Sequence, residues 1–427
     1  KPRAVGRKPR AEAHEPKRKG GSLRTEAVKG ESALRRFVVS AIFCLTAFAM
    51  RVAVRAEPAF ANVYATHMNA FWVNTLGRFS SLFGFSLVEI LIYLLLVLAV
   101  VLLVRIIRGN VIRIRSRARQ DSDSLQTQKY QDNVILTRSR ARQGKAQGFR
   151  PYGKDELLLV LFLASLIFLL FECNEDMYFD RTTFSDTYGY GQGSYSTENL
   201  ETVCRMLVDK SNALSDQVAR NEAGIMQCDD GIRGRVRRSM ITLGTEYPYL
   251  GGWYPKAKPL LISQLLSYSS MTGIYSAYTI EANYNAEMTP YNIPYTMCHE
   301  LSHLKGVMQE NQANFCAYLA CIGSEDADIL YSGYLTAWVY CGNELYRRDY
   351  DSWKKLAGEL RHSCNVDLQD NNDFWAAHEG KVSEATESFN DSWLKSHGQK
   401  DGTLSYDKVV DLIISYEMEK KDDRESG

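Results

Sequence analysis

FSLVEILIYLLLVLAVVLLV, residues 85–104, decides the class of fold to which this chain belongs. Glu89 is the one charged residue in these twenty positions. A helix rises about 1.5 Å per residue, so twenty residues match the roughly 30 Å hydrocarbon thickness of a bilayer. The stretch therefore predicts a helix that spans a membrane.

Two further apolar blocks flank this span. FVVSAIFCLTAFAM begins at residue 37 and continues to Val54 past Arg51, whose long side chain can reach the interface. LLLVLFLASLIFLLF, residues 157–171, is shorter but almost purely aliphatic and aromatic, and a buried core helix is its alternative. We expect three spans, at about 37–54, 85–104 and 157–171. The first block also fits a signal peptide, because Ala59-Phe60-Ala61 resembles a small-x-small cleavage site.

Charge is distributed unevenly around these blocks, although the whole chain has a formal net charge of +1. Residues 1–36 hold 12 Lys and Arg against 4 acids, and residues 105–156 hold 13 against 5. The positive-inside rule then predicts a basic cytoplasmic tail (1–34) and a basic cytoplasmic loop (105–156) in a multi-pass protein of the cell membrane. From residue 157 onward there are 23 basic and 39 acidic residues, as expected of an exported region. Nucleic acid is not an expected partner, because the basic stretches adjoin apolar spans and show no nucleic-acid-binding pattern.

The region beyond the third span divides into a linker and a domain. Residues 172–196 include a polar, Gly- and Tyr-rich run that predicts a linker, and residues 197–427 are enough for an independent core. Apolar periodicity predicts a mostly helical domain, and alternating aromatic and β-branched residues predict a strand or hairpin at 272–285. The predicted helices are 198–220, 229–243, 309–322, 325–349 and 351–364.

CHELSHLKG, residues 298–306, carries the chemistry. On a helix the i, i+4 spacing puts His299 and His303 on one face, where both can bind one Zn²⁺, with Glu300 beside the open position of the metal. Gly306 is well placed to end this helix. The next helix supplies Glu310 as the first carboxylate after the turn, which completes a predicted site of His299, His303 and Glu310.

Zinc held in this way would activate a water molecule and polarise a carbonyl, with Glu300 as the general base of peptide-bond hydrolysis. Two readings remain open beside it: polar residues on a half-buried helix, and a metal site without turnover. Glu325 and Asp328 are the fallback third ligands.

The motifs resemble known families. HELSHLKG followed by ENQAN is similar to the gluzincin metallopeptidases, whose second motif Glu310, Ala313 and Asn314 match. The overall layout also resembles an uncharacterised family of bacterial multi-pass membrane proteins with an exported HExxH domain. The features that suggest it are the three spans, KPLLISQLLSYSSMTGIYSAYTIEANYN, CHELSHLKG and YSGYLTAWVYCGNELYRR. The resemblance implies a zincin-like α+β domain behind three transmembrane helices. The gap from His303 to Glu310 is short for a gluzincin, and in the metzincin spacing the third ligand would fall on Gln309, a poor zinc ligand.

Further residues are candidates for contacts with a peptide or protein substrate. Residues 280–285, with Glu281 and Asn283, are a candidate edge strand for an extended peptide, or else an ordinary core hairpin. Tyr331, Tyr334 and His362 are candidates to donate a hydrogen bond to a developing oxyanion.

Eight of the nine cysteines, all but Cys44, lie in the region placed outside, where disulfides become possible. Buried free thiols are the alternative reading.

The sequence thus predicts a membrane-anchored zinc metallopeptidase with an extracytoplasmic catalytic domain. One rival is an inactive metal- or peptide-binding sensor that signals through the spans. Another is an intramembrane protease, which would need the HExxH helix to lie within the bilayer.

Overall fold

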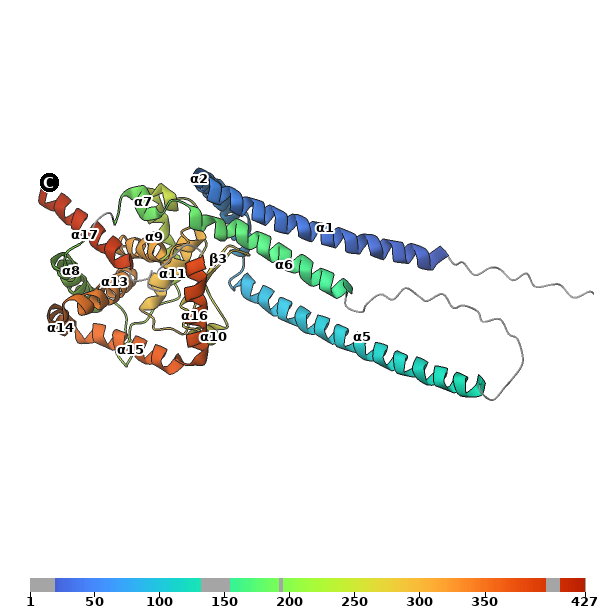
Figure 1. Cartoon of the computed structure of the whole chain (residues 1–427). Coiled ribbons are helices and arrows are strands. Elements are labelled where there is room, and N and C mark those ends of the chain that lie inside the picture. Colours follow the sequence, from blue (N-terminus) through green and yellow to red (C-terminus); the bar gives the residue numbers. More distant parts are fainter. Residues whose placement is uncertain (1–19, 132–153, 192–194, 397–407, 427) are drawn as a thin grey trace, which may run out of the picture. The chain divides into compact units, whose positions relative to one another are not determined.

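The computed structural model describes residues 20–131, 154–191, 195–396 and 408–426, and these are mostly helical (Figure 1). Three helices are long and apolar enough to cross a membrane: Glu31–Ala56, Leu87–Ser116 and Asp155–Asp180. Each overlaps one of the three predicted spans, so the expectation of a membrane protein with three apolar helices is confirmed. These helices belong to α1 (Gly20–Ala56), α5 (Leu87–Gln131) and α6 (Lys154–Asn174) with the turn that follows α6.

The chain divides into two compact units. The smaller unit takes Lys1–Leu45 and Leu102–Leu166, and the larger unit takes Thr46–Val101 and Ile167–Gly427. In the described part of the smaller unit, Arg105 forms an ion pair with Glu156 at 3.4 Å. The predicted basic loop is helical up to Gln131, because α5 continues past its apolar part, and residues 132–153 lie outside the described residues.

The larger unit begins well before residue 197, the predicted start of the domain. The segment 172–196, predicted as a linker, contains the 3₁₀ turn η3 (Asp176–Asp180) and the short helix α7 (Phe184–Tyr188). Phe184 is fully buried in the main core, against Phe315 of α12. Tyr178 is also buried in this core, and Tyr188 and Tyr190 pack against it. The polar and Gly-rich composition concealed these aromatic contacts.

The segment between the first two spans is part of the larger unit and packs against its core. It is helical through α2 (Pro58–Tyr64), η1 (Ala65–Asn69), α3 (Ala70–Trp72), η2 (Val73–Gly77) and α4 (Arg78–Ser80). Its buried positions recur every three or four residues, at Ala61, Ala65, Asn69, Val73, Gly77 and Ser80. Its opposite side exposes large apolar side chains, at Phe60, Val63, Phe71, Phe79 and Leu82. The segment also carries polar side chains outside the buried face, at Asn62, Thr66 and Asn74, so it presents both apolar and polar groups. It is called the amphipathic segment (residues 58–82) below.

A three-stranded sheet lies beside the helices, in the order β1-β3-β2. β1 (Lys258–Pro259) pairs parallel with β3 (Glu281–Tyr284), and β2 (Gly273–Ser276) pairs antiparallel with β3, with Gly273 opposite Tyr284. The predicted hairpin at 272–285 is confirmed. The prediction of residues 280–285 as an edge strand is wrong, because β1, which the sequence did not reveal, covers the second side of β3.

The remaining helices of the larger unit form its core. They are α8 (Thr197–Ser215), α9 (Ile232–Glu246), the turn η4 (Pro248–Leu250), α10 (Ser263–Tyr268), α11 (Asn292–Leu304), α12 (Glu310–Ile322), α13 (Ala327–Arg348), α14 (Tyr350–Glu359), α15 (His362–His378), α16 (Lys381–Ser396) and α17 (Val409–Ser426). The helix predicted at 351–364 is broken after Glu359. Asn212 causes the break, because its side chain donates to Glu359 O and accepts from Arg361 N–H, which replaces helical hydrogen bonds.

The second span is tied to the sheet through buried carboxylates. Glu281 accepts hydrogen bonds from the N–H groups of Leu87 and Val88, at 3.0–3.1 Å, and forms a buried ion pair with Lys258. Glu89 in turn accepts from Leu261 N–H and from the next amide, each at 3.0 Å. The first four N–H groups of a helix lack partners within the helix, so the bonds to Glu281 explain why α5 begins at Leu87.

Arg51 in the first span has partners of its own. It pairs with Glu172 at 3.0 Å and with Asp176 at 3.5 Å, both near the end of the third span. Arg51, whose side chain was expected to reach the interface, is thus a paired charge, as charged residues within spans usually are.

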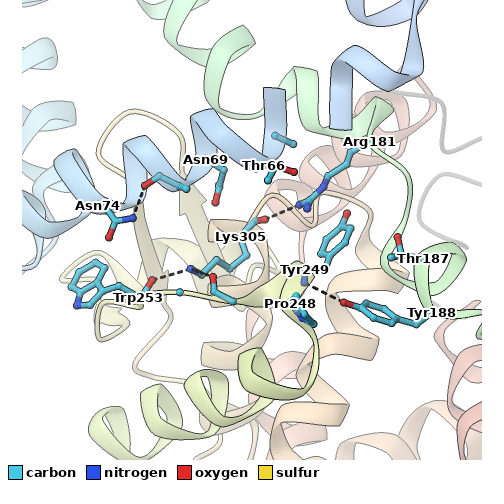
Figure 2. A pocket seen from close by; sticks show the side chains of 14 residues that line it. Thr66, Asn69, Asn74, Arg181, Thr187, Tyr188, Pro248, Tyr249, Trp253 and Lys305 are labelled. Atoms are coloured by element: carbon cyan, nitrogen blue, oxygen red, sulfur yellow. Dashed lines mark hydrogen bonds between the residues drawn. The ribbon is translucent and has the colours of Figure 1, made fainter. Parts of the chain in front are cut away.

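A cavity of about 390 Å³ lies between the amphipathic segment and the loop after α9 (Figure 2). Thr66, Asn69 and Asn74 line it from the segment, and Arg181 and Lys305 contribute two positive charges.

We predict that Glu281→Gln lowers the free energy of unfolding by about 3–5 kcal/mol, because it leaves Lys258 as a buried, unpaired cation. Thermal melting of the full chain in detergent measures the change. Asp391→Asn, which breaks the exposed pair with Lys395, is the control and should barely move the midpoint. An unchanged midpoint for Glu281→Gln would show that the buried pair with Lys258 does not stabilise the fold.

Candidate metal centre

α11 holds the HExxH residues in a buried position. Pro294 falls in its first turn, where proline is tolerated, and Ser332 Oγ accepts from Tyr295 N–H at 3.0 Å. Met297, Cys298, Leu301 and Leu304 are fully buried and fix which face points at the site.

Gly306 ends α11, as the sequence predicted. Its φ is +79°, its N–H donates to His303 O at 2.8 Å, and Val307 N–H donates to Ser302 O at 3.2 Å. These two bonds form a Schellman motif, which favours glycine at the left-handed position. The turn is short, so Glu310 starts α12 within reach of the two histidines.

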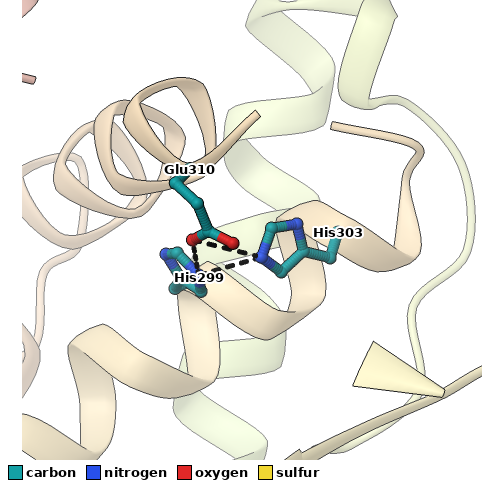
Figure 3. Close-up of side chains that lie close together, drawn as sticks. All are labelled: His299, His303 and Glu310. Atoms are coloured by element: carbon teal, nitrogen blue, oxygen red, sulfur yellow. Dashed lines mark hydrogen bonds and ion pairs between the residues drawn. The ribbon is translucent and has the colours of Figure 1, made fainter. Parts of the chain in front are cut away.

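His299, His303 and Glu310 converge (Figure 3). Nε2 of His299 lies 2.9 Å from Nε2 of His303, and Glu310 Oε2 lies 3.3 Å and 3.8 Å from them, respectively. All the ligand atoms lie within 4.8 Å of one another, so the cluster can hold a metal ion. These are the three residues that the sequence predicted as ligands.

Hydrogen bonds at the far nitrogens orient both imidazoles. His299 Nδ1 lies 2.8 Å from Asn314 Oδ1, and His303 Nδ1 lies 2.7 Å from Val307 O. Because both oxygens only accept, each Nδ1 donates to them, and in the neutral imidazole Nε2 then has a lone pair for a ligand bond. Asn314 matched the family motif in the sequence, but its contact with His299 is a tertiary feature.

Burial and the Glu310 carboxylate together set the protonation of the two imidazoles. Burial, helped by the nearby His299, lowers the pKa of His303 to about 4, so this imidazole is neutral near pH 7. Burial opposes the charged form of His299, but the hydrogen bond and charge of Glu310 outweigh it and raise the pKa of His299.

Glu300 is buried between α11 and β2. Burial raises its pKa to about 8, so it can exchange a proton near neutral pH. Its Oε2 atom has no hydrogen-bond partner among the described residues. Gly273 of β2 leaves room for this carboxylate, because a Cβ at that position would collide with Glu300 Oε1. The sequence carried no signal for Gly273, since the clash arises only when β2 packs against α11.

Other predicted residues lie in different surroundings. Tyr331 is fully buried, and its hydroxyl donates to Asp367 at 2.6 Å and accepts from Arg220 at 3.3 Å, which commits it to a structural network. Tyr334 lies on α13 with its ring against Tyr318, and His362 is exposed at the start of α15.

The remaining candidates serve the fold. Asn283 is buried in the central strand, and its amide donates to Ile274 O at 3.3 Å. Asp328, a fallback ligand, is paired with Arg235 at 2.8 Å, and Glu325 is exposed. Gln309 precedes α12 and is not part of the cluster.

All nine cysteines, each in a described segment, are free thiols. Cys298 and Cys321 approach one another to 3.8 Å between their sulfur atoms, in the buried contact of α11 with α12.

We predict that Asn314→Ala weakens metal binding by about 10- to 100-fold, because His299 loses the partner that orients its ring. Chelator competition on the full chain measures the affinity. Asn311→Ala, on the same helix, is the matched control. Equal affinities of Asn314→Ala and the parent would show that the 2.8 Å contact does not orient a ligand.

A comparison with protein families matches residues 64–414 to a family described as "Protein of unknown function (DUF3810)". The match covers the amphipathic segment from Tyr64 onward, the second and third spans and the metal cluster. No curated protein matches the chain, and no solved structure matches it.

Proposed function

The chain belongs to the DUF3810 family, and from this premise we propose that it is a membrane-anchored zinc metallopeptidase that hydrolyses peptide bonds outside the cytoplasm. One observation carries the proposal: His299, His303 and Glu310 converge on one point, with the Glu300 carboxylate on the same helix. The extracytoplasmic placement rests on the basic stretches before the third span and the acidic region after it.

The donor set fits zinc. A tetrahedral ion with ligands at roughly 2.0–2.2 Å separates them by about 3.3–3.6 Å. The distances in the cluster, 2.9, 3.3 and 3.8 Å, lie around that range. Two imidazoles and one carboxylate are typical of catalytic zinc, which keeps a fourth position open. The hydrogen bonds at both Nδ1 atoms support the same assignment.

Zinc supplies an activated water and polarises the scissile carbonyl when it is bound. Glu300 accepts the proton of that water at its carboxylate and returns it to the leaving nitrogen. Burial raises the pKa of Glu300 to about 8, which is close enough to neutral pH for the carboxyl group both to accept and to release a proton.

β2 offers a place for the substrate. Within the described segments it pairs with β3 alone, so its outer side is an edge where an extended peptide can add a strand. Gly273 of β2 adjoins Glu300, which puts a peptide on this edge next to the general base. Tyr334 and His362 remain candidates for binding the oxyanion.

We predict that the full chain, purified in detergent, holds close to one zinc per chain and that His299→Ala and Glu310→Ala each lose it, because two ligands hold zinc too weakly. Elemental analysis measures the metal content. The exposed His362 provides the control, His362→Ala, which should keep its zinc. A folded parent that takes up no zinc would refute the peptidase proposal, and loss with His299→Ala alone would move the third ligand away from Glu310.

We predict that Glu300→Gln keeps its zinc but loses hydrolysis by about 10²- to 10⁴-fold, because the amide cannot accept the proton. Cleavage of a library of internally quenched peptides measures the rate, with zinc content determined on the same samples. Cleavage that persists at the parental rate would exclude Glu300 as the base.

A second candidate is a catalytically inactive sensor of metal or peptide. It is favoured by the bonds from Glu281 and Glu89, which join the second span to the sheet and to the loop at Leu261. Retained metal without any Glu300-dependent cleavage supports this candidate.

A further inference from the structure

The cavity beside the amphipathic segment holds two cations from distant parts of the chain (Figure 2). Arg181 directly follows the third candidate span, and Lys305 directly follows α11. Among the described residues, no Asp or Glu lines this cavity. Its charge is therefore positive and uncompensated within its own walls.

The cations are held by neutral groups. Arg181 donates to Lys305 O at 3.2 Å, and its guanidinium lies 3.4 Å from the centre of the Tyr249 ring. Lys305 donates to Gly251 O and Trp253 O, each at 2.9 Å. Neither forms an ion pair with any residue in the described ranges.

Donors remain on both side chains. A guanidinium has five N–H donors and an ammonium has three, so Arg181 keeps four and Lys305 keeps one. A partly buried cation without a counter-charge is unfavourable, and a bound anion relieves that cost. Burial also lowers the pKa of Arg181, in keeping with a charge that has no acidic neighbour.

The walls suit a ligand larger than a bare ion. The volume of about 390 Å³ is in the range of small-molecule sites. Thr66, Asn69 and Asn74 offer polar groups on one side, and aromatic rings line the other. Gly252 has φ of +100°, and a Cβ there would lie 3.3 Å from Lys305 Nζ, so glycine keeps the ammonium approachable. The planar fork of arginine matches the oxygens of a phosphate group.

The position of the cavity indicates a membrane source for the ligand. Its wall at 65–74 belongs to the segment between the first two candidate spans, and Arg181 lies one residue beyond the third. The same segment exposes Phe60, Phe71 and Leu82, as helices in the plane of a bilayer interface do. Lipid headgroups lie at this level.

We propose that this cavity binds the phosphate group of an anionic phospholipid headgroup, with Arg181 and Lys305 donating to the phosphate oxygens and the polar side chains of the amphipathic segment facing the rest of the headgroup. The proposal does not depend on metal binding or on peptidase activity. It gives the chain a lipid-binding site beside the segment that follows the first span and the residue that follows the third.

The test is a titration of the delipidated full chain, in neutral detergent, with short-chain phosphatidylglycerol, short-chain phosphatidylcholine and inorganic phosphate. Calorimetry measures the affinities, and melting temperatures show that each variant is folded. We expect one saturable site for phosphatidylglycerol and weaker binding of the other two. Arg181→Gln should weaken phosphatidylglycerol by about tenfold or more, because it removes charge-assisted hydrogen bonds.

Two further variants keep the outcome decisive. Ala70→Phe fills the cavity from an exposed position of α3 while both cations stay, and it should also abolish the site. Arg55→Gln removes an exposed charge at the end of the first span and should leave binding unchanged. Binding of phosphatidylglycerol that is absent from the folded parent, or equal in the parent and Ala70→Phe, overturns the proposal. Inorganic phosphate that binds as tightly as phosphatidylglycerol overturns the lipid source and leaves a site for soluble phosphate.

Discussion

Two imidazole nitrogens, Nε2 of His299 and Nε2 of His303, face each other at 2.9 Å with the Glu310 carboxylate against both. In the neutral imidazoles both nitrogens carry lone pairs, because the Nδ1 atoms donate elsewhere, and this arrangement favours a cation between them. Two features of the larger unit hold these three side chains in place. The Schellman turn at Gly306 brings α12 back onto α11, and the buried face of α11 prevents the histidines from rotating away.

The second constraint is the attachment of the sheet to the second span. Glu281 belongs to the central strand, yet its carboxylate takes up the first free amides of α5 and the charge of Lys258. β2 pairs with this strand and passes Glu300 at Gly273. Glu300 and the start of the second candidate span are therefore linked through one hydrogen-bonded pair of strands.

The fold and the site differed in how far they could be predicted. The main helices at 309–322 and 325–349, the hairpin and the three spans followed from local periodicity. β1 did not, because two residues carry no periodicity, and its absence from the prediction made β3 an edge strand. The burial of Phe184 was also missed, because the residues around it are polar and show no apolar periodicity. The sequence predicted Tyr331 as a donor to the oxyanion, but its hydroxyl is hydrogen-bonded to Asp367 and Arg220.

By itself, the sequence determined the three apolar helices and the pairing of His299 with His303. Hydropathy and the helical period are local properties, and i, i+4 neighbours share a face wherever the helix lies. Only the tertiary structure decided the partners of those residues. Asn314 orients His299, Gly273 makes room for Glu300, Glu281 caps a helix 194 residues away, and Arg181 meets the carbonyl of Lys305 across 124 residues. Such contacts depend on which surfaces pack together, and no spacing along the chain encodes that.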